Sequence, residues 1–182
     1  MSTETFLTPA ELDILRGLLG QELSSYGTDL EIDEGLAAFD VWLECEQGWV
    51  HLAYEETVVD FDAGFENVES LLRIHPQGGE FPGWESHDLK GRITKITRIQ
   101  DKITAVDKLE EAVAWEWWRE SGLRFTLDSG QELIIHRAAT VNGEVRMRAG
   151  DAGGVEPDPI PKRPFQEGQK RRYEFERREV EL

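Results

Sequence analysis

The feature that most constrains the fold is strict alternation of hydrophobic and polar side chains on both sides of a glycine turn. Residues 123–127 alternate in this way, residues 128–130 are Asp-Ser-Gly, and Leu133 and Ile135 continue the hydrophobic face afterwards. Alternation with a period of two is typical of a half-buried β-strand. A short turn with glycine in the left-handed conformation joins such strands into a hairpin. The sequence therefore predicts an antiparallel hairpin over residues 123–136.

Other segments repeat this pattern and extend the predicted sheet. Residues 39–46 alternate, the Gln47–Gly48 pair predicts a turn, and residues 50–54 alternate again. Spaced isoleucines and threonines in residues 91–100 and 102–109 predict strands, because β-branched side chains favour extended backbone. A second glycine turn, Asn142–Gly143, predicts a further hairpin.

The N-terminal segment predicts one amphipathic helix over residues 7–27. Thr8 can cap it, Pro9 suits the first helical position, and Glu11 completes a capping box. Leucines at steps of three and four residues define an apolar face, and Gly27 predicts the end of the helix. The expected fold class is α+β: a mostly antiparallel β-sheet with an N-terminal amphipathic helix packed on it.

Composition changes towards the C-terminus and predicts the domain organisation. We expect a single α+β domain over residues 1–150. Residues 151–182 begin with closely spaced glycines and prolines, which predict an extended arm, and end in a charged tail. The tail can form either a short helix or a last strand.

The net charge of −17 is concentrated at one end of the chain. Residues 1–70 hold 17 acidic side chains and one basic side chain, Arg16, of the 37 acidic and 20 basic side chains in the whole sequence. Two explanations stay open: a solubilising surface, or an acidic face for a basic protein partner. Direct nucleic-acid binding is not expected, because phosphates require a basic patch. The basic cluster in residues 170–178 is interrupted by glutamates.

The single cysteine and the lack of long apolar runs predict the cellular setting. Cys45 cannot form an internal disulfide, which fits a reducing compartment. No hydrophobic run approaches the roughly 20 residues of a membrane-spanning helix. The N-terminus lacks the basic and apolar regions of a signal peptide. We therefore expect a cytoplasmic protein with no membrane contact.

Motifs for catalysis or metal binding are not found in the sequence. Cys45 lies between Glu44 and Glu46, and neighbouring carboxylates raise the pKa of a thiol, so a small core residue is the favoured interpretation. The four histidines form no metal-binding pair at a known spacing. We predict no catalytic residue, no metal site and no cofactor.

A long segment at residues 75–92 keeps one alternative open. It is rich in glycine and proline, shows no periodicity, and is flanked by His75 and His87. Loops of this length are often functional, so a small-ligand site or a minor enzyme activity beneath this loop remains an alternative.

Three tryptophans, Trp115, Trp117 and Trp118, form the densest aromatic cluster. On an extended segment Trp115 and Trp117 share one face and Trp118 lies on the other, whereas on a helix Trp115 and Trp118 align. The favoured interpretation is that some of these rings belong to the hydrophobic core and the others cover it. The alternative is a binding surface, because tryptophan is enriched at interface anchors.

The predicted partner-binding surface centres on Trp42. Its strand face carries carboxylates, and a tryptophan ringed by carboxylates suits a partner with lysine or arginine at its centre. An acidic connection before this strand extends the surface. The full predicted set is Asp40, Trp42, Glu44, Glu46, Trp49, Glu31, Asp33 and Glu34.

The stretches GRITKITRIQ (91–100) and WEWWRESGLRFTLDSGQELIIH (115–136) resemble segments of small acidic immunity proteins of bacterial toxin–immunity systems. The resemblance rests on spaced isoleucines, a tryptophan, and a hairpin with a glycine turn, and it carries over no binding residue. It implies a non-catalytic inhibitor that neutralises a cognate toxin, here a basic one. The other alternative is an assembly or structural subunit whose residues 151–182 reach a neighbouring subunit.

Overall fold

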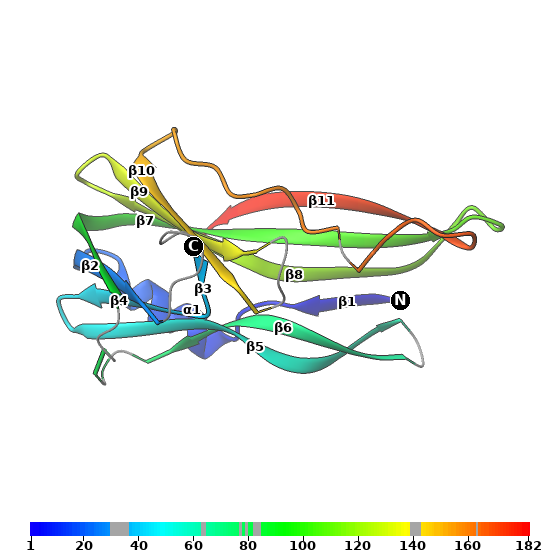
Figure 1. The fold of residues 1–182 in the computed structure, drawn as a ribbon, viewed down its shortest axis with the longest axis horizontal. Coiled ribbons are helices and arrows are strands. Elements are labelled where there is room, and N and C mark those ends of the chain that lie inside the picture. The colour runs from blue at the N-terminus through cyan, green and yellow to red at the C-terminus, as the bar shows by residue number, and fades with distance from the viewer. Residues whose placement is uncertain are drawn as a thin grey trace.

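The protein is built from two layers of β-strands that face each other, with one short helix beside them (Figure 1). The computed structural model describes residues 1–29, 37–62, 65–76, 78, 80–81, 85–138, 143–162 and 164–182. The elements in these residues are β1 (Ser2–Thr5), α1 (Pro9–Leu18), β2 (Glu22–Thr28), β3 (Ala37–Ala38), β4 (Asp40–Cys45), β5 (Gly48–Asp62), β6 (Phe65–His75), β7 (Glu85–Asp107), β8 (Ala112–Leu127), β9 (Gln131–Arg137), β10 (Val145–Asp151) and β11 (Arg171–Glu181).

Strand β7 belongs to both layers. Its first part, residues 85–92, pairs with β2 and so joins a layer in the order β7-β2-β4-β5-β6, which we call the first layer. Its remainder, residues 93–107, pairs with β8 on one side and β11 on the other, and the second layer continues through β9, β10 and β3. Every pairing is antiparallel except that of β1 with β8. The predicted fold class is confirmed: a strand-dominated α+β fold, mostly antiparallel, with the N-terminal helix packed on the sheet.

The hydrophobic core lies between the layers in two main clusters. The larger one joins inward-facing residues of β4 and β5 to those of β8, β9 and β10, and includes Leu15 and Leu18 of α1. The smaller one is aromatic and contains Phe61, Trp117 and Phe165. Alternation along each strand produces this arrangement, since every second side chain points into the sandwich.

The start of the helix was predicted correctly, but its end was not. Thr8 caps it and the capping box with Glu11 is present. The helix ends at Leu18 rather than near Gly27, because Gly20 adopts φ +85 and turns the chain into β2. Leu23 is a buried core residue of this strand, so its spacing from the helical leucines was coincidental. This helix is not long and apolar enough to cross a membrane, and the described residues contain no other helix.

Most of the predicted strands are present, some of them longer than expected. The turn residue Asn142 of the predicted second hairpin lies outside the described residues. Residues 50–54 belong to the 15-residue strand β5, and residues 91–107 lie in the 23-residue strand β7. The supposed loop at 75–92 is shorter, because residues 85–92 are the beginning of β7. The charged tail forms β11, and this strand pairs along β7 from Arg171↔Asp107 to Glu181↔Thr97.

The tryptophan cluster adopts the extended geometry. Trp115 and Trp117 are buried in the aromatic part of the core, where the Trp117 ring stacks on Phe61 at 4.6 Å between centroids. Trp118 lies on the opposite face, half-buried beneath the Arg178 guanidinium, which is 4.1 Å from the ring centroid. Trp115 and Trp117 therefore belong to the core, and Trp118 belongs to its cover.

A layer of buried polar groups contacts both hydrophobic clusters. Arg119 and Arg137 are both buried there, over the rings of Trp117 and Tyr54 respectively. Burial, together with the nearby charge of Arg137, lowers the pKa of Arg119 to about 9. Tyr54 donates its hydroxyl hydrogen to the Ser121 carbonyl at 2.5 Å, and burial raises its pKa. These contacts hold β5 and β8 in fixed register across the sandwich.

Candidate protein-binding surface

Three rings form a stacked row across the outer face of the first layer. Trp42 on β4 lies directly opposite His51 on β5, and His51 lies directly opposite His75 on β6. The ring centroids are 4.8 Å apart for Trp42–His51 and 4.9 Å apart for His51–His75, with interplanar angles of 18° and 15°. Side chains that face each other on antiparallel strands start about 5 Å apart, which is the spacing that lets flat rings stack.

Phe81 extends this row. Its ring stacks on Trp49 at 4.9 Å and meets the edge of Trp42 at 5.6 Å. Gly27, which faces Trp42 from β2, makes room for it: a Cβ atom at Gly27 would lie 2.5 Å from the Phe81 ring. We call Trp42, Trp49, His51, His75 and Phe81 the aromatic row. Gly27 therefore makes space for the Phe81 ring on this surface and does not end a helix.

Carboxylates hold the two histidines of the aromatic row. Asp40 Oδ1 lies 2.7 Å from His51 Nε2, and Glu55 Oε1 lies 2.7 Å from His75 Nε2. The side chains are partly open to solvent, with exposed fractions of 36% for Asp40 and 50% for Glu55. Each carboxylate thus orients an imidazole and still presents acidic oxygen atoms at the surface.

Four of the predicted partner-binding residues come together here. Asp40, Trp42 and Glu44 share the outer face of β4, and Trp49 lies opposite Glu44 on β5. Glu44 accepts a hydrogen bond of 2.6 Å from the Ser25 hydroxyl, which fixes its carboxylate.

The remaining predicted residues do not join this group. Glu46 lies in the exposed turn after β4 and pairs with Arg92 at 3.2 Å, so its charge is partly compensated. Glu31, Asp33 and Glu34 lie outside the described residues.

Sequence reasoning missed His51, His75, Phe81 and Glu55. The pairing of β4 with β5 would have revealed His51, because the residue opposite Trp42 follows from the position of the turn. The observed turn lies at Glu46 and Gln47, one residue before the predicted one, with Cys45 facing Gly48. Moving a two-residue turn by one position changes every cross-strand partner by two, which would have placed Ala53 opposite Trp42. Phe81 had no pattern that could have revealed it.

The charge asymmetry of the sequence becomes an asymmetry between the two layers. Strands β2, β4, β5 and most of β6 come from residues 1–70, where 17 acidic side chains accompany one basic one. In the second layer acids and bases alternate and pair, as in Arg98–Glu120 at 2.7 Å and Arg124–Glu132 at 2.9 Å. The segments that build most of the first layer therefore carry the excess negative charge of the sequence.

Cys45 is a core residue, as predicted. Its side chain is buried in the larger cluster between the layers. Burial, together with the charges of Glu44 and Glu46, raises the pKa of this thiol to about 12. A thiol with this pKa carries almost no thiolate at neutral pH, which disfavours a nucleophilic role.

The histidines do not form a metal site in the part of the chain that the structure describes. No group of three or more histidine, cysteine, aspartate or glutamate side chains there could hold a metal ion. His87 stacks on Tyr26 at 4.9 Å, and His75 contacts Glu55 and His51 instead. His136 is buried in β9.

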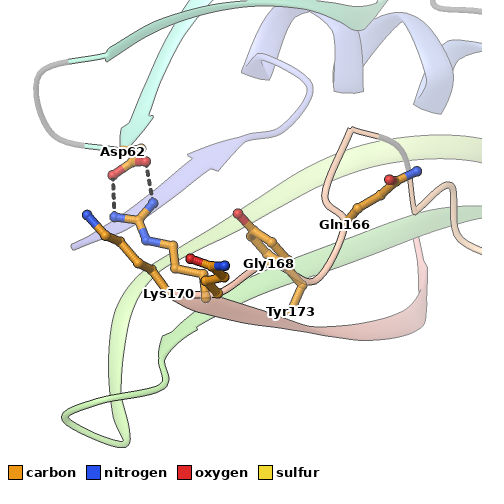
Figure 2. A pocket seen from close by; sticks show the side chains of 7 residues that line it. Asp62, Gln166, Gly168, Lys170 and Tyr173 are labelled. Atoms are coloured by element: carbon orange, nitrogen blue, oxygen red, sulfur yellow. Dashed lines mark hydrogen bonds and ion pairs between the residues drawn. The ribbon is translucent and has the colours of Figure 1, made fainter.

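A hollow lies at the far end of β5, next to the start of β11. Figure 2 shows Asp62 facing an arginine, with Lys170 beside the pair and Tyr173 and Gln166 further along the wall. The arginine is Arg171, whose guanidinium makes both contacts to Asp62. The cavity measures about 660 Å³. Its walls carry more positive than negative side chains, so it does not suit a basic partner, and the ion pair fastens β11 to β5.

Comparisons of this chain with models of protein families, with curated proteins and with solved structures find no match. The resemblance to immunity proteins remains a prediction from the sequence.

Proposed function

We propose that this chain is a non-catalytic protein-binding protein of the immunity or inhibitor type, which holds a basic partner against the outer face of its first layer. One observation carries the proposal: the aromatic row lies between the carboxylates of Asp40, Glu44 and Glu55. Large rings give contact area, and the surrounding acids select a partner that presents lysine or arginine.

The rigidity of this surface supports the proposal. The rings support one another by stacking, and hydrogen bonds fix the carboxylates of Asp40, Glu44 and Glu55. Binding therefore requires little loss of side-chain freedom, a loss that costs about 0.5–1.5 kcal/mol for each long side chain ordered at an interface. A prearranged row of this kind gives more affinity than the same residues would give on mobile loops.

The charge of the first layer supports the same partner class. An acidic face attracts a basic protein over distances up to the Debye length, about 8 Å at physiological ionic strength. Association should therefore slow as salt increases. A toxin whose active site is basic, such as one that acts on nucleic acid, is the partner class that fits best.

The other two candidate functions have less support. The ligand-site alternative required residues 75–92 as a lid, but residues 85–92 pair with β2 as part of β7. The assembly alternative required a free tail, but β11 pairs with β7 of its own chain along 11 residues.

The proposal can be tested with the purified product of the neighbouring gene as the first binding partner. Reversing two charges of the surface, in the double variant Asp40→Lys and Glu44→Lys, is expected to weaken binding by about tenfold or more. Raising the salt concentration should weaken binding of the unmodified chain and have less effect on the variant. Isothermal titration calorimetry at two salt concentrations measures both effects.

A matched control distinguishes this surface from net charge alone. The double variant Glu174→Lys and Glu176→Lys makes the same change in charge on the exposed edge strand β11. It should bind almost as well as the unmodified chain. If both double variants weaken partner binding equally, the effect is one of net charge and not of this surface. If binding is tight and neither the variants nor salt alters it, the proposed surface is refuted.

A further inference from the structure

We infer that the acidic hollow beside the aromatic row is the socket for one arginine side chain of the partner. This inference rests on the proposed function and names the group that the surface recognises. The hollow has a volume of about 320 Å³. Its walls include Asp40, Glu55 and Glu56, with the exposed ring of Phe39 at its edge and no basic side chain among the described lining residues. It is small for a typical ligand pocket but large enough for one long side chain.

Ser70 gives independent evidence for a ligand in this hollow. It is fully buried, it lines the hollow, and its hydroxyl has no hydrogen-bond partner among the described residues. A Cβ atom built on Gly143, on the facing wall, would lie 3.5 Å from this hydroxyl oxygen. The hydroxyl therefore faces Gly143, another residue of the wall. A buried polar group without a partner is costly, so a donor that enters the hollow would be favoured.

Glu56 supplies the negative charge that such a donor needs. It lies directly opposite Ser70 on the neighbouring strand, is exposed, and has no ion-pair partner in the part of the chain that the structure describes. The carboxylates of Asp40 and Glu55 are already bonded to His51 and His75, so Glu56 is the wall carboxylate left free.

The shape and chemistry favour arginine. A planar guanidinium carries five N–H donors, so it can bond to the Glu56 carboxylate and the Ser70 hydroxyl together. Its flat face can also lie against an aromatic ring such as Phe39.

Arg137 fixes two residues that line the hollow, Ser70 and Tyr54. Arg137 donates a hydrogen bond to the Ser70 carbonyl and lies over the Tyr54 ring at 5.0 Å. The charge of Arg137 is opposed by nearby Glu69 and Asp101 in the buried polar layer. The socket is thus prearranged, as the aromatic row is.

The test uses the full chain and N-acetyl-arginine N-methylamide as the probe, followed by NMR. The neutral control is the citrulline compound, which has nearly the same shape but no charge. We expect the arginine compound to shift the backbone amide signals of residues 54–56 and Ser70, and the citrulline compound to leave them unchanged. The variants Glu56→Gln and Ser70→Ala should each weaken binding of the arginine compound by about two- to fivefold. Glu66→Gln, at an exposed carboxylate of β6, should not.

Equal shifts with both compounds, or arginine binding that Glu56→Gln and Ser70→Ala leave unaltered, would overturn the inference. The two proposals fail separately. If the double variant Asp40→Lys and Glu44→Lys loses partner binding but the arginine compound does not bind in the hollow, the socket is refuted and the proposed binding surface stands. Arginine binding in the hollow without any effect of the double variant on partner binding would refute the surface.

Discussion

Replacing Trp117 with alanine is expected to lower the free energy of unfolding by about 3–5 kcal/mol, the cost typical of removing a large buried aromatic side chain. The ring is fully buried, stacks on Phe61, and donates its indole N–H to the Thr5 hydroxyl at 2.9 Å. The last contact joins β8 to β1, so the substitution removes both packing between the layers and a bond within one layer. Urea unfolding followed by circular dichroism measures the change.

Trp118 is the matched control, because it is the adjacent tryptophan on the other face of β8. It is half-buried and is covered by Arg178, with the Lys102 amine 5.3 Å from its ring centroid. Trp118→Ala removes part of this cover and should cost only about 1–2 kcal/mol. The extended conformation of β8 requires this difference in stability cost, because it places Trp117 and Trp118 on opposite faces. A Trp118→Ala cost equal to that of Trp117→Ala would contradict the assignment of one ring to the core and the other to its cover.

Stability is expected to decrease as the pH falls from about 6.5 towards 4, in part because of His136. This side chain is buried in β9, and burial lowers its pKa to about 4, with Arg148 and Arg177 acting in the same direction and Asp158 opposing them. The unfolded chain binds a proton near pH 6.5, whereas the folded chain does not until about pH 4. Protonation therefore favours the unfolded chain across this interval. The expected contribution at pH 4.5 is about 2–3 kcal/mol.

The variant His136→Asn isolates this contribution. Asparagine can still donate to the Arg137 carbonyl, which lies 3.0 Å from His136 Nδ1, but it does not titrate. Its absolute stability should be lower, because a buried ring is lost. Between pH 7 and 4.5 it should lose about 2–3 kcal/mol less than the unmodified chain does. Parallel stability curves for the two proteins, from urea unfolding at each pH, would show that His136 is not buried in its neutral form.

Much of the fold could be predicted from alternation and turns. The hairpin at residues 123–136 and the start of the helix follow from local rules, since a period of two defines a half-buried strand and a capping box defines a helix start. The end of the helix could not be predicted, because Leu23 continues the helical spacing by chance. Only the turn at Gly20 shows that the chain has already left the helix.

The candidate surface could be predicted only in part. The sequence indicated Asp40, Trp42 and Glu44, because they alternate on one strand. His51 and His75 depend on the register between strands that are apart in the chain, and a turn misplaced by one residue changes that register.

The aromatic row also changes the meaning of Trp42. Among carboxylates alone, a tryptophan would be an isolated anchor. Stacked on His51 and contacted at its edge by Phe81, it belongs to a rigid strip that crosses β4, β5 and β6. Such a strip suits a flat, basic surface with one protruding side chain, and the hollow lined by Ser70 and Glu56 is where that side chain would enter.

The central claim is that a partner covers the outer face of the first layer, and oxidative footprinting of the complex tests it most directly. Hydroxyl radicals modify exposed aromatic side chains, and tryptophan residues on both layers report in the same experiment. On addition of the partner, oxidation of Trp42, Trp49 and Phe81 should fall, while that of Trp118 should stay unchanged. Protection of Trp118, with Trp42 and Trp49 oxidised as in the free chain, would contradict the claim.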